Sequence, residues 1–126
     1  MGFTRRVATA LLLGLSACGA PSASGPAPVR DYLYLWTASA DTTYPDFLAV
    51  LDVTEDSGRY GRLVATLPVP GRGNMPHHTE HELPADRQLF ANGFKSGRTF
   101  IFDLADPVRP RIAGELGDVE GYRHPH

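Results

Sequence analysis

Cysteine, positive charge and long apolar runs are all scarce in this sequence of 126 residues. The single cysteine excludes a disulfide bond within the chain. The formal net charge of −2 leaves no excess of basic side chains for a phosphate backbone, which argues against a nucleic-acid partner. The extended apolar run at the N-terminus is too short to cross a bilayer, so we expect no membrane-spanning helix in the mature chain.

Proline and glycine, by contrast, are abundant. The chain contains 11 prolines and 13 glycines, and both residue types interrupt long helices and mark turns. The length allows one small domain. We therefore expect many short elements joined by tight turns.

The N-terminal segment has the composition of an export signal. Arg5 and Arg6 form a basic start, residues 7–15 are apolar, and small residues follow. Residues 15–18 read Leu-Ser-Ala-Cys, which resembles the lipobox of bacterial lipoproteins. The resemblance implies a signal peptide over residues 1–17, with lipid attached to Cys18 after cleavage. A plain secretory signal with an incidental cysteine is the alternative.

The lipobox resemblance also implies a location. Lipid on Cys18 would anchor the protein to a membrane of the cell envelope, and Gly19 in place of aspartate would favour the outer membrane in a Gram-negative cell. Residues 18–30 are rich in Pro, Ala, Ser and Gly, a composition that cannot bury apolar surface. We expect this segment to be a flexible tether ahead of a domain over residues 31–126.

The rest of the chain has the pattern of an all-β protein. Short apolar runs alternate with turn residues and show no helical period, which predicts strands over residues 32–37, 47–53, 62–67, 88–94, 98–104 and 111–116. The runs at 47–51 and 99–102 are continuously apolar, as expected for a sheet covered on both faces.

The second half of this region repeats the first. Four pairs of matching residues lie 49 positions apart, namely Leu63 and Ile112, Leu67 and Leu116, Pro76 and Pro125, and His77 and His126. A period of about 50 residues with about four strands per unit is typical of β-propeller blades. Because a ring needs about four to eight blades, we expect about two antiparallel four-stranded blades of an incomplete propeller. Chance similarity between two hairpins is the alternative.

The five histidines fall into two groups that we expect to lie in loops. His77, His78 and His81 form one group, and His124 and His126 the other. Imidazole is a common ligand of zinc, copper, nickel and iron, and a histidine repeated in each blade could point toward a shared axis. The best candidate ligands are His77 or His78 together with His126, followed by His81 as a further ligand or a supporting residue. Two polar surface loops are the alternative.

Several segments follow the order seen in a known family. They are Tyr34-Leu35-Trp36, Tyr44-Pro45-Asp46-Phe47-Leu48-Ala49-Val50-Leu51-Asp52-Val53, Tyr60-Gly61, Leu67-Pro68-Val69-Pro70 and His77-His78. Together they resemble the N-terminal part of the selenium-binding protein family, whose bacterial members include methanethiol oxidases. The resemblance implies a propeller of about seven blades. It also implies a metal, copper in the methanethiol oxidases, with ligands among His77, His78, His81 and His126.

The sequence departs from the family at one element, and it also resembles a more general propeller repeat. Selenium-binding relatives carry a Cys-x-x-Cys element soon after the paired histidines, whereas residues 79–84 contain no cysteine. This argues against a thiolate selenium site and weakens the case for thiol oxidation as the specific reaction. Residues 100–110 separately resemble the LVIVD-type propeller repeat, which implies a fold but no activity.

Two functions follow as expectations. The first is an exported lipoprotein of the methanethiol oxidase type, here its N-terminal part, which uses a histidine-bound metal to oxidise a small thiol. The second is a non-catalytic propeller of the cell envelope that binds a metal or a protein. Under both readings, further blades or other chains are needed to close the ring.

Overall fold

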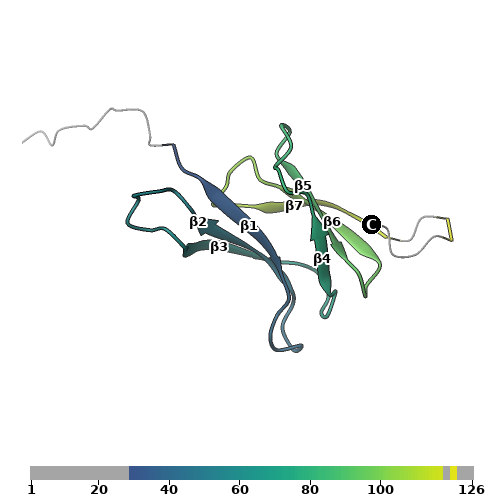
Figure 1. The fold of residues 1–126 in the computed structure, drawn as a ribbon. Helices are drawn as coiled ribbons and strands as arrows, with labels where there is room; N and C mark the ends of the chain where they lie inside the picture. Colours follow the sequence, from purple (N-terminus) through teal and green to yellow (C-terminus); the bar gives the residue numbers. More distant parts are fainter. Residues whose placement is uncertain (1–28, 118–119, 122–126) are drawn as a thin grey trace, which may run out of the picture.

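The computed structural model describes residues 29–117 and 120–121, and this part of the chain is all-β (Figure 1). Its seven strands form two antiparallel sheets. The expected all-β fold class is therefore confirmed, and the two sheets correspond to partial propeller blades. Within these residues no helix has the length and apolar character needed to cross a membrane.

The first sheet has the order β1-β2-β3 and the second the order β4-β5-β6-β7. The strands of the first sheet are β1 (Tyr32–Thr37), β2 (Phe47–Asp52) and β3 (Arg62–Pro68). Those of the second are β4 (Pro76–Thr79), β5 (Gln88–Gly93), β6 (Arg98–Asp103) and β7 (Arg111–Leu116). Each strand pairs with its sequence neighbour, as in a β-meander.

The six strands expected from the sequence all form, each within one residue of its expected bounds. One detail of the expectation is wrong. The segment around His77 and His78 is not a loop but strand β4, the short edge strand of the second sheet. Among the described residues, the first sheet has three strands and the second has four, as in partial propeller blades.

The internal repeat is present in three dimensions. The pairing of β2 with β3 shifts register between Val50 and Leu51, and the pairing of β6 with β7 shifts at the equivalent point between Ile101 and Phe102. Asp52 and Asp103 end the two equivalent strands, and each accepts a hydrogen bond from the backbone N–H two residues ahead. Strands β1, β2 and β3 thus correspond to β5, β6 and β7.

The core lies between the two sheets. Its fully packed members are Leu48, Val69, Leu89, Ala91, Phe100, Phe102 and Leu104. Trp36 reaches from β1 onto this cluster, with its ring edge-on to Phe100 at a centroid distance of 5.5 Å. Its indole N–H donates to the backbone carbonyl of Asn92 at 2.8 Å. Trp36 therefore joins the two sheets by both packing and a hydrogen bond.

A buried carboxylate fixes the start of β4. Asp46, which is 2% exposed, accepts backbone N–H groups from Ser39 at 3.0 Å and from Asn74 at 2.6 Å. The carboxylate thus organises the backbone of two loops, the one after β1 and the one before β4. Because Asn74 lies two residues before Pro76, this contact holds the strand that carries the paired histidines against the first sheet.

Candidate functional site

Strand β4 brings two histidines to the edge of the second sheet. It pairs with β5 on one side and packs beside β1 of the first sheet (Figure 1). His77 and His78 are both exposed. An edge strand between two sheets can therefore present both imidazoles to solvent or to a ligand.

A β-bulge breaks the regular alternation of side chains at this point. Pro76 pairs with Gly93 and Thr79 pairs with Ala91, so His77 and His78 together face the single residue Asn92. Consecutive side chains of a regular strand point to opposite faces of the sheet. An extra residue in the strand removes that constraint and can redirect a side chain, which is why bulges are frequent beside functional sites.

The two imidazole rings converge as a result. Their Nδ1 atoms lie 2.8 Å apart, and one ring donates a hydrogen bond to the other according to its tautomer. The rings are nearly perpendicular, with centroids 4.1 Å apart and an interplanar angle of 83°. The ring of His77 also packs against Phe94 at a centroid distance of 5.2 Å. The pair is thus an ordered local cluster rather than two independent surface side chains.

The spacing of the pair fits two ligands of one metal ion. Metal–imidazole bonds are about 2.0–2.1 Å long, so two nitrogens 2.8 Å apart can both bind one ion that replaces the proton between them. Imidazole nitrogen suits zinc, copper, nickel and iron. Within residues 29–117 and 120–121, no three His, Cys, Asp or Glu side chains gather closely enough to hold an ion.

The other candidate residues lie apart from the pair or outside the described residues. His81 follows the end of β4 and lines a pocket of about 470 Å³ between β1 and the segment after β4. His126 and His124, like Cys18 with the expected signal and tether, fall outside the described residues. The structure therefore brings together two of the four candidate ligands, His77 and His78.

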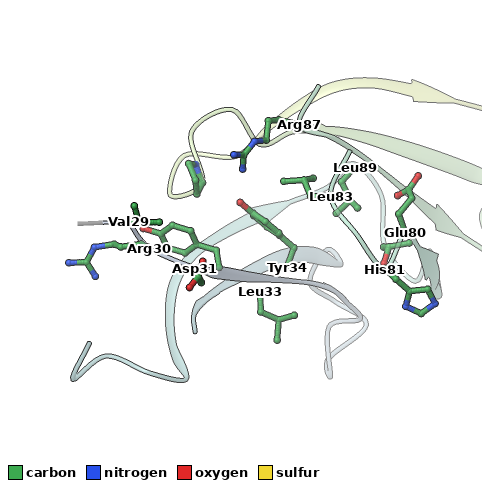
Figure 2. A pocket seen from close by; sticks show the side chains of 13 residues that line it. Val29, Arg30, Asp31, Leu33, Tyr34, Glu80, His81, Leu83, Arg87 and Leu89 are labelled. Atoms are coloured by element: carbon green, nitrogen blue, oxygen red, sulfur yellow. The ribbon is translucent and has the colours of Figure 1, made fainter. Parts of the chain in front are cut away.

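The pocket beside His81 is lined by both charged and apolar side chains. Figure 2 shows Arg30 and His81 at opposite ends, with Tyr34, Leu83 and Leu89 between them. Burial raises the pKa of the Tyr34 phenol, and the nearby positive charge of Arg87 partly opposes this shift. The shift favours the protonated phenol, which can act as a hydrogen-bond donor.

Glu80 lines both this pocket and a second pocket that His78 also lines. Its carboxylate accepts the backbone N–H of Phe90 on β5 at 3.1 Å. This contact closes the end of the β4–β5 pairing.

Asn92 is a site residue that the sequence did not reveal. It is 6% exposed, its Oδ1 accepts the backbone N–H of His78 at 2.8 Å, and its carbonyl accepts the Trp36 indole. It also lines, with His78, a pocket of about 410 Å³ on the far face of the second sheet. A lone amide directly after the apolar run Leu89-Phe90-Ala91 was the available signal, but its hydrogen-bond partner could not be known without the register of the strands.

Similarity to known proteins covers most of the chain. No protein-family model matches it. A methanethiol oxidase from Hyphomicrobium sp. is 35% identical over 102 residues, which cover 77% of this chain and 23% of that protein. The crystal structure of a hypothetical selenium-binding protein from Sulfolobus tokodaii superposes with a TM-score of 0.57 and 25% identity, over 73% of this chain and 24% of that one. The chain spans about a quarter of the length of these relatives.

Proposed function

Because the chain belongs to the family of selenium-binding proteins and methanethiol oxidases, we propose that it is part of a metal-dependent oxidoreductase in which His77 and His78 bind the metal. The family is oxidoreductase-like, which supports the class of reaction. The observation that carries the proposal is the convergence of two imidazoles on the bulged edge strand β4, with Nδ1 atoms 2.8 Å apart.

Copper is the metal we propose for this site. Two imidazole nitrogens suit copper as well as zinc, nickel or iron, and the resemblance to methanethiol oxidases favours copper. His81 and His126 are proposed as further ligands, completed by residues of other blades. Bound copper would supply the one-electron redox chemistry needed to oxidise a small thiol with dioxygen.

The described residues would bind, orient and expose the reacting centre. The two backbone positions of the bulge set the directions of the imidazoles, and Phe94 packs against the ring of His77 and restricts its rotation. Both histidines are exposed, so a small substrate such as a thiol can approach the side that the protein leaves open.

The proposal extends to the cell envelope. A signal over residues 1–17 and lipid on Cys18 would place the protein on a membrane surface through a tether of residues 18–30. Two fatty chains on one cysteine would be enough for stable anchoring.

A non-catalytic binding module is the second candidate. The face of the first sheet that points away from the second exposes Leu33, Leu35 and Leu63, which are 44%, 41% and 59% exposed. An apolar face of this kind fits a docking surface for another sheet or protein. The same histidine pair would then hold a structural metal such as zinc without turnover.

Metal binding by variants of the intact protein tests the proposal. His77→Ala and His78→Ala should each weaken copper binding, measured by competition with a chelator, by more than the roughly 10–100-fold typical of supporting residues. Lys95→Ala, an exposed cation close to Phe94, is the matched control and should leave binding unchanged. Thiol consumption and redox cycling of the bound copper should fall in parallel in the two histidine variants.

Each other outcome has a distinct meaning. Wild-type copper affinity in both histidine variants would reject the proposed ligands. Tight binding of zinc, with loss in both variants and no redox cycling with copper, would support the binding module instead.

A further inference from the structure

Asn92 is the one residue that faces both histidines across the bulge. It lies on β5, opposite the two-residue insertion in β4, and it is almost completely buried. Its side-chain oxygen accepts the His78 backbone N–H at 2.8 Å. The bulge and this hydrogen bond therefore occur at the same point of the sheet.

The hydrogen bond from His78 to Asn92 supplies an acceptor that the bulge would otherwise remove. An extra residue disrupts the local ladder of backbone hydrogen bonds and leaves an N–H group in need of another acceptor. Asn92 Oδ1 takes that place for His78. Without this acceptor, β4 would be more stable in a regular register, because the backbone N–H of His78 could then find another acceptor. In a regular register, neighbouring side chains point to opposite faces.

Asn92 is itself held in place from the first sheet. Its carbonyl accepts the indole N–H of Trp36 at 2.8 Å, and Trp36 packs edge-on against Phe100 in the core. The backbone next to it is also tightly packed, since a Cβ atom at Gly93 would lie 2.9 Å from the Cβ of Asn74. The backbone that carries this acceptor is thus held at the interface between the two sheets.

We propose that Asn92 is a positioning residue for the His77–His78 pair, which it holds on one side of β4 by accepting the His78 backbone N–H. This inference rests on the proposed function for its consequence, the binding of a metal. Its structural part is independent of any metal, because it concerns the distance between the two imidazoles.

The test compares three forms of the intact protein, the wild type, Asn92→Leu and Asn92→Asp. Leucine has a similar size but offers no acceptor, whereas aspartate keeps an oxygen at the same place. Crystal structures without metal should show the His77 and His78 Nδ1 atoms in contact in the wild type and Asn92→Asp, and separated in Asn92→Leu. Copper affinity should fall about 10–100-fold in Asn92→Leu, with an altered Cu(II) electron paramagnetic resonance spectrum, and Asn92→Asp should restore both.

The outcomes separate this inference from the proposed function. If the Nδ1 contact and the copper spectrum are unchanged in Asn92→Leu, the inference is overturned, even where His77→Ala abolishes binding. If the contact is lost in Asn92→Leu while no variant affects copper, the positioning role stands and the proposed metal site fails. Should Asn92→Leu not fold, Asn92→Ala provides the same readouts.

Discussion

Asp52 and Asp103 lie at equivalent positions at the ends of β2 and β6. Each carboxylate accepts a hydrogen bond from the backbone nearby. The Thr54 N–H donates to Asp52, and the Ala105 N–H donates to Asp103. These backbone hydrogen bonds lower the pKa of both carboxyls, with additional contributions from Arg30 at Asp52 and Arg111 at Asp103. An aspartate that accepts a backbone N–H group therefore stabilises the equivalent turn after β2 and after β6.

The lowered pKa of Asp52 makes part of the stability depend on pH. A carboxyl whose pKa is lower in the folded state stabilises the fold above its unfolded pKa, and this contribution is lost as the pH falls through the folded pKa. Asp52→Asn keeps the shape but not the charge. We expect the wild type to have the higher melting temperature at pH 7, and the difference to shrink as the pH falls below about 4.

Thermal unfolding of the intact protein from pH 7 down to pH 3 measures this difference. Glu82→Gln, which changes an exposed carboxylate, is the control and should follow the wild type throughout. A gap between wild type and Asp52→Asn that stays constant with pH would contradict the assignment.

At the scale of elements, β4 depends on close packing at its partner strand. Gly93 pairs with Pro76, and a Cβ there would lie 2.6 Å from the Ser96 hydroxyl and 3.0 Å from the Asn74 carbonyl oxygen. A carbonyl oxygen of the backbone cannot move aside as a flexible side chain can. The pairing of β5 with the first residue of β4 therefore requires glycine at position 93.

Gly93→Ala should destabilise the protein by about 1–3 kcal/mol, the usual cost of overpacking. Gly117→Ala is the matched control, because a Cβ at Gly117 meets nothing within 4 Å, and its stability should stay close to that of the wild type. Denaturant unfolding of the intact protein compares the two. Equal stability of Gly93→Ala and Gly117→Ala would show that the Asn74 backbone yields without cost.

The strands that bury apolar side chains were predictable from the sequence, and β4 was not. Runs such as 47–51 and 99–102 have only one stable environment, a sheet covered on both faces, so their type and bounds follow from composition. Strand β4 starts with proline and continues with two exposed histidines and a threonine. Neither hydrophobic pattern nor β-propensity marks it, because its pairing is imposed by β5 and by the Asp46–Asn74 contact.

At the scale of the whole molecule, the repeat could be predicted from the sequence, whereas the arrangement of the two histidines depends on tertiary contacts. The offset of 49 residues between β3 and β7 indicated a repeat, and the equivalent register shifts confirm it. The histidines at 77 and 78 were recognisable as metal-ligand types. Their convergence on one side of β4 depends on a bulge whose hydrogen-bond acceptor lies 14 residues away at Asn92, a tertiary contact that spacing cannot reveal.

The two sheets also indicate how the site would be completed in a larger assembly. In the second sheet, the face equivalent to the exposed Leu33 and Leu35 face of the first is buried, with Leu89 and Ala91 in the core. A further sheet against the first would cover it in the same way. Strands equivalent to β4 in such sheets are where we expect additional histidine ligands.

The most direct measurement is anomalous X-ray scattering at the copper edge from crystals of the intact protein grown with Cu(II). We expect a peak within about 2.0–2.1 Å of Nδ1 of both His77 and His78, and its loss in the His77→Ala/His78→Ala double variant. Copper bound elsewhere, with the two imidazoles still hydrogen-bonded to each other, would contradict the proposed metal site.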